Sequence, residues 1–421
     1  MNIELKEYGE PVFYPSNYIN IEAIHSANKY WRRALKLAKD PIRAKEISNG
    51  ILELRAEGVT GVIQVDNINI EVVPKFLSDT SGNWKAVLWK ILTMVEGGYI
   101  DKGLTTANRL SVLSIPDLLA EIFYNSYFKG AARGLPRAYS TGIGAGNVLR
   151  GKLDYSRINE WTAKPWLLPY VTDSLCDDTS VSSLLRWTAE CLATTVKAAG
   201  RARTMHEIAS ELSHVNKSPP NLIDAQKIYL GPLHRGLEEA VLIGILLLKG
   251  HGILHERGHY KLSGFLWNSD VIYENYIYML CERAASSCGN RVNKALVKFG
   301  ELIRGKGGKL ETTPDVVFKN INGTPIAVTD AKYKNINGRP KSQDTYQILT
   351  AAHVLGCQRV SLIYPVAVNL EPTAWVVKSG LGGDHVELTM LPLNLMQLVI
   401  PGGQEKIINM IVYWLKGRFE K

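Results

Sequence analysis

A strand–turn–strand pattern late in the chain, with an acid on each side of the turn, most constrains the fold. Val316-Val317-Phe318 and Ile326-Ala327-Val328 are short apolar runs that favour strands, and Asn322-Gly323 lies between them. This dipeptide is typical of tight hairpin turns, because both central residues of a type I′ turn need a positive φ. The sequence therefore predicts a β-hairpin that brings Asp315, before the first strand, beside Asp330, after the second run.

A lysine follows the second acid at a spacing of two, in Asp330-Ala331-Lys332. Residues i and i+2 of a strand point to the same face, so we expect Asp330 and Lys332 to project together while Ala331 faces the other way. With Asp315, two carboxylates and an ammonium group would share one small site. This group suits phosphodiester hydrolysis, because carboxylates hold Mg²⁺ and the bound ion activates water and binds the scissile phosphate. The ammonium can orient or help deprotonate that water and offset the developing charge.

Pro314-Asp315 together with Asp330-Ala331-Lys332 resembles the PD-(D/E)xK nuclease motif. The motif is short, and an acid followed at two residues by lysine also recurs by chance. The alternative interpretation is a surface hairpin with a single ion pair. Val- and Ile-rich strand residues surround both halves of the motif, and solvated charges seldom lie within such strands, which favours the nuclease interpretation.

A helix is predicted on each side of the hairpin, and each carries a candidate site residue. Glu274 lies on the upstream helix and is predicted to add an acid to the metal site; the alternative is a glutamate on the helix surface. Gln347 lies on the downstream helix, over residues 344–355, and either orients Lys332 or only packs. Lys334 shares the strand face of Lys332 and is predicted to contact a DNA phosphate.

Helix, hairpin and helix in this order form the core layout of the PD-(D/E)xK nuclease fold. Four segments stand out along the chain, the last being the most specific: Gly61-Val62-Ile63 through Val73-Pro74-Lys75, Leu149-Arg150-Gly151-Lys152-Leu153, Tyr273-Glu274, and Asp330-Ala331-Lys332-Tyr333-Lys334 with Tyr346-Gln347. In this order they resemble the McrC family, the nuclease subunit of modification-dependent McrBC restriction systems. The resemblance implies an α/β protein with a C-terminal PD-(D/E)xK restriction-endonuclease-like domain, which has a mixed central sheet flanked by helices, and an N-terminal α+β adaptor domain.

The resemblance also implies a Mg²⁺-dependent DNA endonuclease subunit that works with a McrB-like AAA+ GTPase hexamer. Asp315, Asp330 and Glu274 would hold the metal, and Lys332 and Gln347 would complete the catalytic group. The partner would recognise modified double-stranded DNA, while this chain would cut it and stimulate nucleotide hydrolysis. The rival hypothesis is a non-catalytic adaptor that binds DNA or regulates the motor. The intact acids and lysine argue against this rival, because a degenerate site tends to lose one of them.

At 421 residues the chain is long enough for two domains. The polar stretch 216–221 contains a Pro-Pro pair and is the best linker candidate. We therefore predict a motor-docking region over residues 1–216, with a β-rich start and a helical middle, and an endonuclease domain over residues 222–421.

The first residues lack the apolar core of a signal peptide, and the longest apolar run, 240–248, is too short to cross a bilayer. Five cysteines without a CxxC pair indicate free thiols. These features predict a cytoplasmic protein without membrane contact.

The net charge of +9 is unevenly distributed along the chain. Residues 291–341 hold eleven Lys and Arg against four Asp and Glu, and the basic, glycine-rich stretch 304–309 lies just before the hairpin. A DNA backbone is bound mainly through charge neutralisation. Lys306 and Lys309 are therefore predicted to contact DNA phosphates beside the acids; the alternative is a loop that is only solvated.

Two further motifs point away from other functions. His255-Glu256-Arg257-Gly258-His259 matches HExxH, but that motif needs a continuous helix to bind zinc, and glycines at 250, 252 and 258 indicate a polar loop instead. Residues 142–147 are glycine-rich without the GxGxxG spacing, and no GxxxxGK[ST] motif occurs. The chain is therefore not expected to hydrolyse a nucleotide, so energy for translocation would come from its partner.

Overall fold

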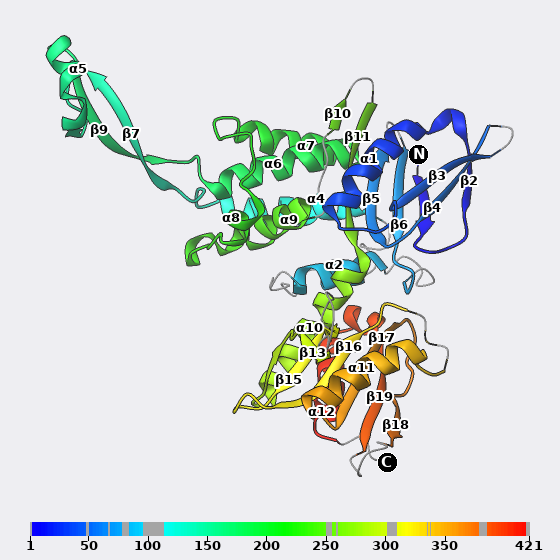
Figure 1. Cartoon of the computed structure of the whole chain (residues 1–421). Coiled ribbons are helices and arrows are strands. Elements are labelled where there is room, and N and C mark those ends of the chain that lie inside the picture. The colour runs from blue at the N-terminus through cyan, green and yellow to red at the C-terminus, as the bar shows by residue number, and fades with distance from the viewer. Residues whose placement is uncertain are drawn as a thin grey trace, which may run out of the picture. The chain divides into compact units, whose positions relative to one another are not determined.

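The computed structural model of the chain forms two compact units (Figure 1). One unit combines Met1–Ile115 with His255–Lys421, and the other is Pro116–Leu254. The predicted linker at 216–221 lies inside the second unit, so the chain passes between the units near residues 115 and 254 instead. The functional division into residues 1–216 and 222–421 stays a prediction. The structure describes residues 2–47, 50–65, 68–77, 84–95, 113–249, 255–257, 260–300, 310–334, 336, 338–378 and 385–417.

A five-stranded sheet in the first unit joins the N-terminal hairpin to a strand from much later in the chain. The β-rich start predicted for the chain is present, and within it two strands form an antiparallel pair that is almost entirely buried. A parallel strand borders one side of the pair and an antiparallel strand the other. In sheet order the strands are β1 (Asn2–Lys6), β6 (Ile68–Val73), β5 (Val59–Val65), β11 (Tyr260–Asn268) and β10 (His255–Arg257).

Glycines allow β5 and β11 to approach closely. Gly264 has a φ of 146°, and a Cβ atom at this position would lie 2.5 Å from the carbonyl oxygen of Val62. The first part of the HExxH segment is not the polar loop expected from its glycines, because His255, Glu256 and Arg257 form the edge strand β10. The zinc site of a protease needs this motif on a continuous helix, and a strand at these three residues does not provide that geometry. Gly258 and His259 lie outside the described residues.

Among the described residues, the N-terminal part of this unit also contains a three-stranded sheet and two α-helices. The first helix is capped by the side chain of Asn20, which accepts a hydrogen bond from the amide of Ala23 at 3.0 Å, and it buries Trp31 completely. The elements are β2 (Val12–Pro15), η1 (Ser16–Tyr18), α1 (Ile21–Ala34), β3 (Ile42–Ile47), β4 (Ile51–Ala56) and α2 (Trp84–Val95), with the strands in the order β2-β4-β3.

The C-terminal part of the same unit contains a mixed six-stranded sheet, as predicted. Its first three strands are antiparallel and include the predicted hairpin, and the next two pair in parallel. In sheet order they are β12 (Arg291–Asn293), β15 (Val316–Lys319), β16 (Pro325–Ala331), β17 (Arg359–Val366), β19 (Val386–Asn394) and β18 (Thr373–Val377); β13 (Val297–Gly300) and β14 (Leu310–Thr312) form a separate pair, and η5 (Leu395–Val399) follows β19.

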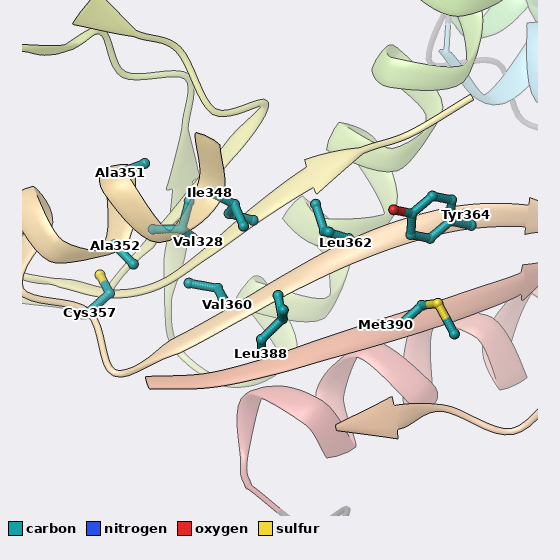
Figure 2. Packing of buried hydrophobic residues seen from close by; sticks show 10 residues of the cluster. All are labelled: Val328, Ile348, Ala351, Ala352, Cys357, Val360, Leu362, Tyr364, Leu388 and Met390. Carbon is teal, nitrogen blue, oxygen red and sulfur yellow. The ribbon is translucent and has the colours of Figure 1, made fainter. Parts of the chain in front are cut away.

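Helices cover both faces of this sheet. Val328 packs with Ile348 in a buried apolar cluster between the sheet and α11 (Ser342–Leu355) (Figure 2). Phe318 points the other way and contacts Trp414 of α12 (Gly403–Leu415), with ring centroids 5.7 Å apart. The helix α10 (Ser269–Ser287) packs against α12. Because strand residues alternate between faces, Asp330 shares the α11 face with Val328.

The hairpin turn differs from the predicted type. Gly323 has a φ of 82°, whereas Asn322 does not have the positive φ that a type I′ turn requires. The amide of Gly323 donates to the carbonyl of Asn320 at 2.9 Å, and the amide of Asn320 donates to the carbonyl of Thr324 at 3.0 Å. This is a three-residue loop that ends in a left-handed glycine. The Asn320 side chain stabilises it by accepting hydrogen bonds from the amides of Asn322 and Thr324.

The second unit is a group of packed helices. The helical middle predicted for residues 1–216 is present here. After it, residues 222–249 form two helices and not one, because Gly231 and Pro232 separate them with a 3-10 turn. Among the described residues, no helix is both long and apolar enough to span a membrane. The helices are α4 (Ile115–Ala131), α6 (Ser180–Thr195), α7 (Ala199–Glu211), α8 (Leu222–Gln226), η4 (Pro232–Leu237) and α9 (Glu238–Lys249).

A long β-hairpin arm extends from these helices (Figure 1). It consists of β7 (Ala138–Gly146) and β9 (Leu168–Cys176), with the short β8 (Lys152–Leu153), η3 (Tyr155–Arg157) and α5 (Ile158–Ala163) between them. The glycine-rich residues 142–147 belong mostly to β7, so they form a strand and not a nucleotide-binding loop. Large apolar side chains are exposed along the arm, among them Tyr155 at 74% and Trp166 at 67%.

Candidate active site

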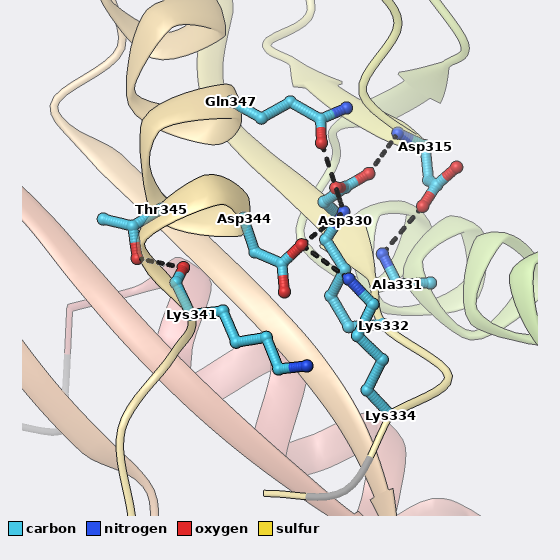
Figure 3. Close-up of polar contacts among 9 residues, drawn as sticks. All are labelled: Asp315, Asp330, Ala331, Lys332, Lys334, Lys341, Asp344, Thr345 and Gln347. Carbon is cyan, nitrogen blue, oxygen red and sulfur yellow. Dashed lines mark hydrogen bonds and ion pairs between the residues drawn. The ribbon is translucent and has the colours of Figure 1, made fainter. Parts of the chain in front are cut away.

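The hairpin places the two predicted acids side by side. Val316 pairs with Thr329, so the next position on each strand holds Asp315 and Asp330. The amide of Asp315 donates to Oδ1 of Asp330 at 3.3 Å, and the amide of Ala331 donates to Oδ2 of Asp315 at 2.7 Å (Figure 3). Asp330 is only 4% exposed. Two carboxylates therefore lie in a fixed arrangement at the end of the hairpin, largely shielded from water.

Burial and the neighbouring carboxylate make Asp315 difficult to ionise. The pKa of Asp315 is raised to about 8, first by burial and then by the charge and hydrogen bonding of Asp330; the amide of Ala331 opposes the shift. Burial also raises the pKa of Glu274, and the nearby charges of Asp270 and Asp330 add to it, while Lys294 and Lys332 act in the opposite direction. A cation bound beside the acids would offset this repulsion.

The predicted lysine points to the same site. The Lys332 ammonium forms an ion pair with Oδ2 of Asp330, and it donates a hydrogen bond to Oε1 of Gln347 at 3.4 Å. It also lies 3.7 Å from Oδ1 of Asp344. Burial alone would lower the pKa of Lys332, but the carboxylates of Asp330, Asp344 and Asp315 outweigh burial and raise it. The structure thus brings Asp315, Asp330, Lys332 and Gln347 together, as the sequence predicts.

One member of this group is missing from the sequence-based prediction. Asp344 lies in the first turn of α11 and is only 3% exposed. Its Oδ1 accepts a hydrogen bond from Lys334 at 2.8 Å, so it contacts both lysines of the strand. The sequence did contain one indication that Asp344 belongs to the site. It lies three residues before Gln347, and residues three apart share a helix face. An acid in the first turn of a helix is more usually explained by the helix dipole.

The acids present a donor set that fits Mg²⁺. Carboxylate oxygens are the hard ligands that this ion prefers, and the raised pKa of Asp315 indicates a buried acid pair that a cation would stabilise. Within the described ranges, no group of three or more His, Cys, Asp or Glu side chains is arranged around one point as metal ligands. The fit therefore rests on Asp315 and Asp330, with Glu274 close enough to affect the pKa of Asp315.

Of the three lysines predicted to contact DNA, only one lies within the described residues. Lys306 and Lys309 lie outside the described residues. Lys334 is within them, and its side chain is 44% exposed although its ammonium is held by Asp344. It therefore borders the acids from a partly open position.

Comparisons with known proteins give one family model and two similar folds. The model of the family described as "McrBC 5-methylcytosine restriction system component" matches residues 54–365. Among curated proteins, none matches the chain. The fold is similar to that of a chain in the half-complex of McrB AAA+ hexamers with bound McrC from Thermococcus gammatolerans, with a TM-score of 0.64 and 14% identity over 98% of this chain and 100% of that chain. A chain of the McrBC complex from the same organism aligns over 68% of this chain and 88% of its own length, at 16% identity and a TM-score of 0.48.

Proposed function

Since this chain belongs to the family of McrBC 5-methylcytosine restriction system components, we propose that it is the Mg²⁺-dependent DNA endonuclease subunit of such a system. The observation that carries the proposal is the buried group of Asp315, Asp330 and Lys332, which lies within the range matched by the family. We assign the six-stranded sheet with α10, α11 and α12 to the PD-(D/E)xK restriction-endonuclease-like fold, because the acids and the lysine occupy the hairpin positions of that motif.

The side chains at this site divide the work of phosphodiester hydrolysis. Asp315 and Asp330 would hold Mg²⁺, which when bound lowers the pKa of its water and binds the scissile phosphate. Asp330, Asp344 and Gln347 hold the Lys332 ammonium in place. Because the surrounding carboxylates raise its pKa, Lys332 stays charged, which suits stabilisation of negative charge on the phosphate and orientation of the attacking water. Glu274, on α10, would add a third carboxylate near the metal.

The motor partner, in this proposal, is a McrB-like AAA+ GTPase hexamer. The fold resembles that found in a complex of McrB AAA+ hexamers with McrC, and the sequence has no P-loop motif of its own. The motor would bring this chain to modified double-stranded DNA, and the chain would in turn stimulate nucleotide hydrolysis by the motor.

The β7–β9 arm offers the surface for this contact. Exposed apolar side chains gathered on one element commonly mark a surface that a partner covers, and the arm presents Tyr139, Ile143, Tyr155 and Trp166. Within the predicted docking region 1–216, the strands β5 and β6 are almost entirely buried, so they leave little surface for a partner. Both segments lie within residues 1–216.

Cleavage of a plasmid that carries 5-methylcytosine tests the proposal. The complete chain with its motor, GTP and Mg²⁺ should cut this plasmid, and chelation of the metal should stop cutting. Asp315→Asn should stop cutting too, because it removes one carboxylate with little change in volume. If the wild-type chain stimulates the motor but leaves the plasmid intact under all these conditions, the non-catalytic adaptor is the correct function.

A further inference from the structure

The residue between the two lysines of the site is held by the N-terminal sheet. The hydroxyl of Tyr333 donates to Oε2 of Glu7 at 2.7 Å, and the ammonium of Lys75 donates to the carbonyl of Tyr333 at 2.6 Å. Glu7 directly follows β1, and Lys75 lies just beyond β6. Because these strands pair in parallel, with Lys6 opposite Val73, the two residues emerge at the same end of the sheet. The hydroxyl and the backbone carbonyl of Tyr333 are therefore both bound by residues from a distant part of the sequence.

The surroundings of this contact are buried and aromatic. Glu7 is 1% exposed and also accepts a hydrogen bond from the amide of Lys75 at 3.2 Å. The Lys75 ammonium lies 4.2 Å from the centroid of the Tyr333 ring, within cation–π range. Phe76 and Tyr273 contact the same ring, with centroids 4.9 and 5.5 Å away. An apolar cavity of about 30 Å³ borders the ring, so packing alone does not fill the space around it.

The backbone that carries the lysines leaves the sheet at this point. β16 ends at Ala331, and the amide of Lys332 makes the last contact with the neighbouring strand, a hydrogen bond to the carbonyl of Ile363 at 2.9 Å. The amide of Lys334 then turns back to the carbonyl of Lys332 at 2.8 Å. Beyond Lys332, the contacts of Tyr333 with Glu7 and Lys75 connect this backbone to the N-terminal sheet.

We propose that Lys75 and Glu7 form a positioning pair for the nuclease centre: by holding Tyr333 at its carbonyl and its hydroxyl, they fix the backbone from which Lys332 and Lys334 project. The inference rests on the proposed nuclease function. Small displacements of a catalytic group are costly, since a shift of about 1 Å can reduce the rate by up to roughly 100-fold. The N-terminal sheet is therefore part of the catalytic architecture, in addition to any role in docking.

A second lysine provides a matched control. Lys90 of α2 donates its ammonium to the carbonyl of Leu398 in η5 at 2.6 Å, and its side chain is half-buried as that of Lys75 is. Both lysines thus connect the N-terminal part of the unit to a backbone carbonyl of the C-terminal part. Only the carbonyl bound by Lys75 lies next to Lys332. Lys75→Met and Lys90→Met therefore remove equivalent hydrogen bonds, with different expected consequences for chemistry.

The test compares these variants as complete chains in complex with the motor, on plasmid carrying 5-methylcytosine. Lys75→Met should lower kcat for cleavage by about tenfold or more while KM for DNA stays within about twofold, and Lys90→Met should change neither. Lys75→Arg, which keeps a charged donor, should recover most of the rate. Backbone amides of residues 332–334 should exchange hydrogen faster in Lys75→Met than in Lys90→Met.

Equal kcat and equal amide exchange in the two methionine variants would overturn the inference. If Lys75→Met does not fold, Tyr333→Phe replaces it, since this variant removes the bond to Glu7; a wild-type kcat would then contradict the positioning role. Failure of the nuclease proposal looks different, because the wild-type complex itself would not cut. In that case the amide exchange of residues 332–334 still decides whether Lys75 positions this segment.

Discussion

The amide of Asp315 donates a hydrogen bond to the carboxylate of Asp330 across the hairpin, at 3.3 Å. The reciprocal bond runs from the amide of Ala331 to the carboxylate of Asp315, at 2.7 Å. Each acid is therefore oriented by the backbone of the opposite strand, so the pairing that forms the hairpin also forms the site. These two backbone bonds explain how two neighbouring carboxyl groups are held together, and they lead to the following predictions.

Asp344→Asn should slow DNA cleavage by roughly 10- to 100-fold, the usual effect of losing a group that orients those in direct contact with the metal or substrate. The variant removes the charge that pairs with Lys334 and lies near Lys332, so both ammonium groups become less well fixed. Glu405→Gln is the control, because Glu405 is also an acid in the first turn of a helix but is exposed. A cleavage rate that is equal in the two variants would remove Asp344 from the site.

The stability of the protein should fall as pH rises from 5 to 8. Burial raises the pKa of Glu7 from 4.5 to about 7, with the Tyr333 hydroxyl and the Lys75 amide and charge opposing the shift. The pKa of Glu7 is therefore higher in the folded protein than in the unfolded chain. Protonated Glu7 makes its full contribution to the free energy of unfolding below pH 4.5, and this contribution is lost as the pH rises through 7. The loss is roughly 3 kcal/mol in the free energy of unfolding.

Glu7→Gln isolates this effect, because glutamine is neutral at every pH and has nearly the same shape. Urea unfolding at pH 5 and pH 8 should show a smaller decrease for Glu7→Gln than for the wild type. Glu10→Gln, at an exposed position, should behave like the wild type. If all three proteins lose the same free energy between these pH values, Glu7 titrates normally in the folded state.

Charge reversal at Lys306 and Lys309 should weaken cleavage equally on DNA of every sequence, because phosphate contacts carry no sequence information. The slope of log affinity against log salt should fall by about one for each DNA phosphate that is no longer neutralised. Lys217→Glu with Lys227→Glu is the control, since these exposed lysines lie in the other unit. Binding measured at several salt concentrations gives the slope, and an unchanged slope would place the glycine-rich stretch away from DNA.

Removing apolar side chains from the arm should uncouple the chain from its motor. Tyr139→Ala combined with Trp166→Ala should raise the concentration needed for half-maximal stimulation of GTP hydrolysis by roughly tenfold or more, as expected for aromatic residues at an interface centre. Both side chains are exposed, so the fold should be unaffected. Tyr229→Ala removes an exposed aromatic residue outside the arm and should have no effect. Identical titration curves for the two variants would place the docking surface elsewhere.

The hairpin and its three charged residues could be predicted from the sequence because they depend on local rules. Strand alternation places Asp330 and Lys332 on one face, and the short connection to Asp315 leaves few alternatives. The turn type was wrong because the side chain of Asn320 binds two amides of the loop, an interaction that the Asn-Gly dipeptide does not indicate.

The contributions of Glu7 and Lys75 could not be predicted in this way. Their contacts with Tyr333 join residues that are 326 and 258 positions apart, and no periodic pattern connects segments so distant. The first unit is built from two separate stretches of sequence, and this could not be predicted for the same reason. Its strands β5 and β11 pair with each other although the whole sequence of the second unit lies between them. A fragment that begins near residue 222 would separate these strands, so point variants of the complete chain are the better test of function.

Asp330→Asn tests the central claim most directly, because it removes one charge from the acid pair with almost no change in volume. Plasmid cleavage and GTP hydrolysis should be measured together, in the complex with the motor and with Mg²⁺ present. The predicted result is loss of cleavage with undiminished stimulation of GTP hydrolysis, as Lys332→Ala should also show. Cleavage by Asp330→Asn at the wild-type rate would contradict the assignment of this site.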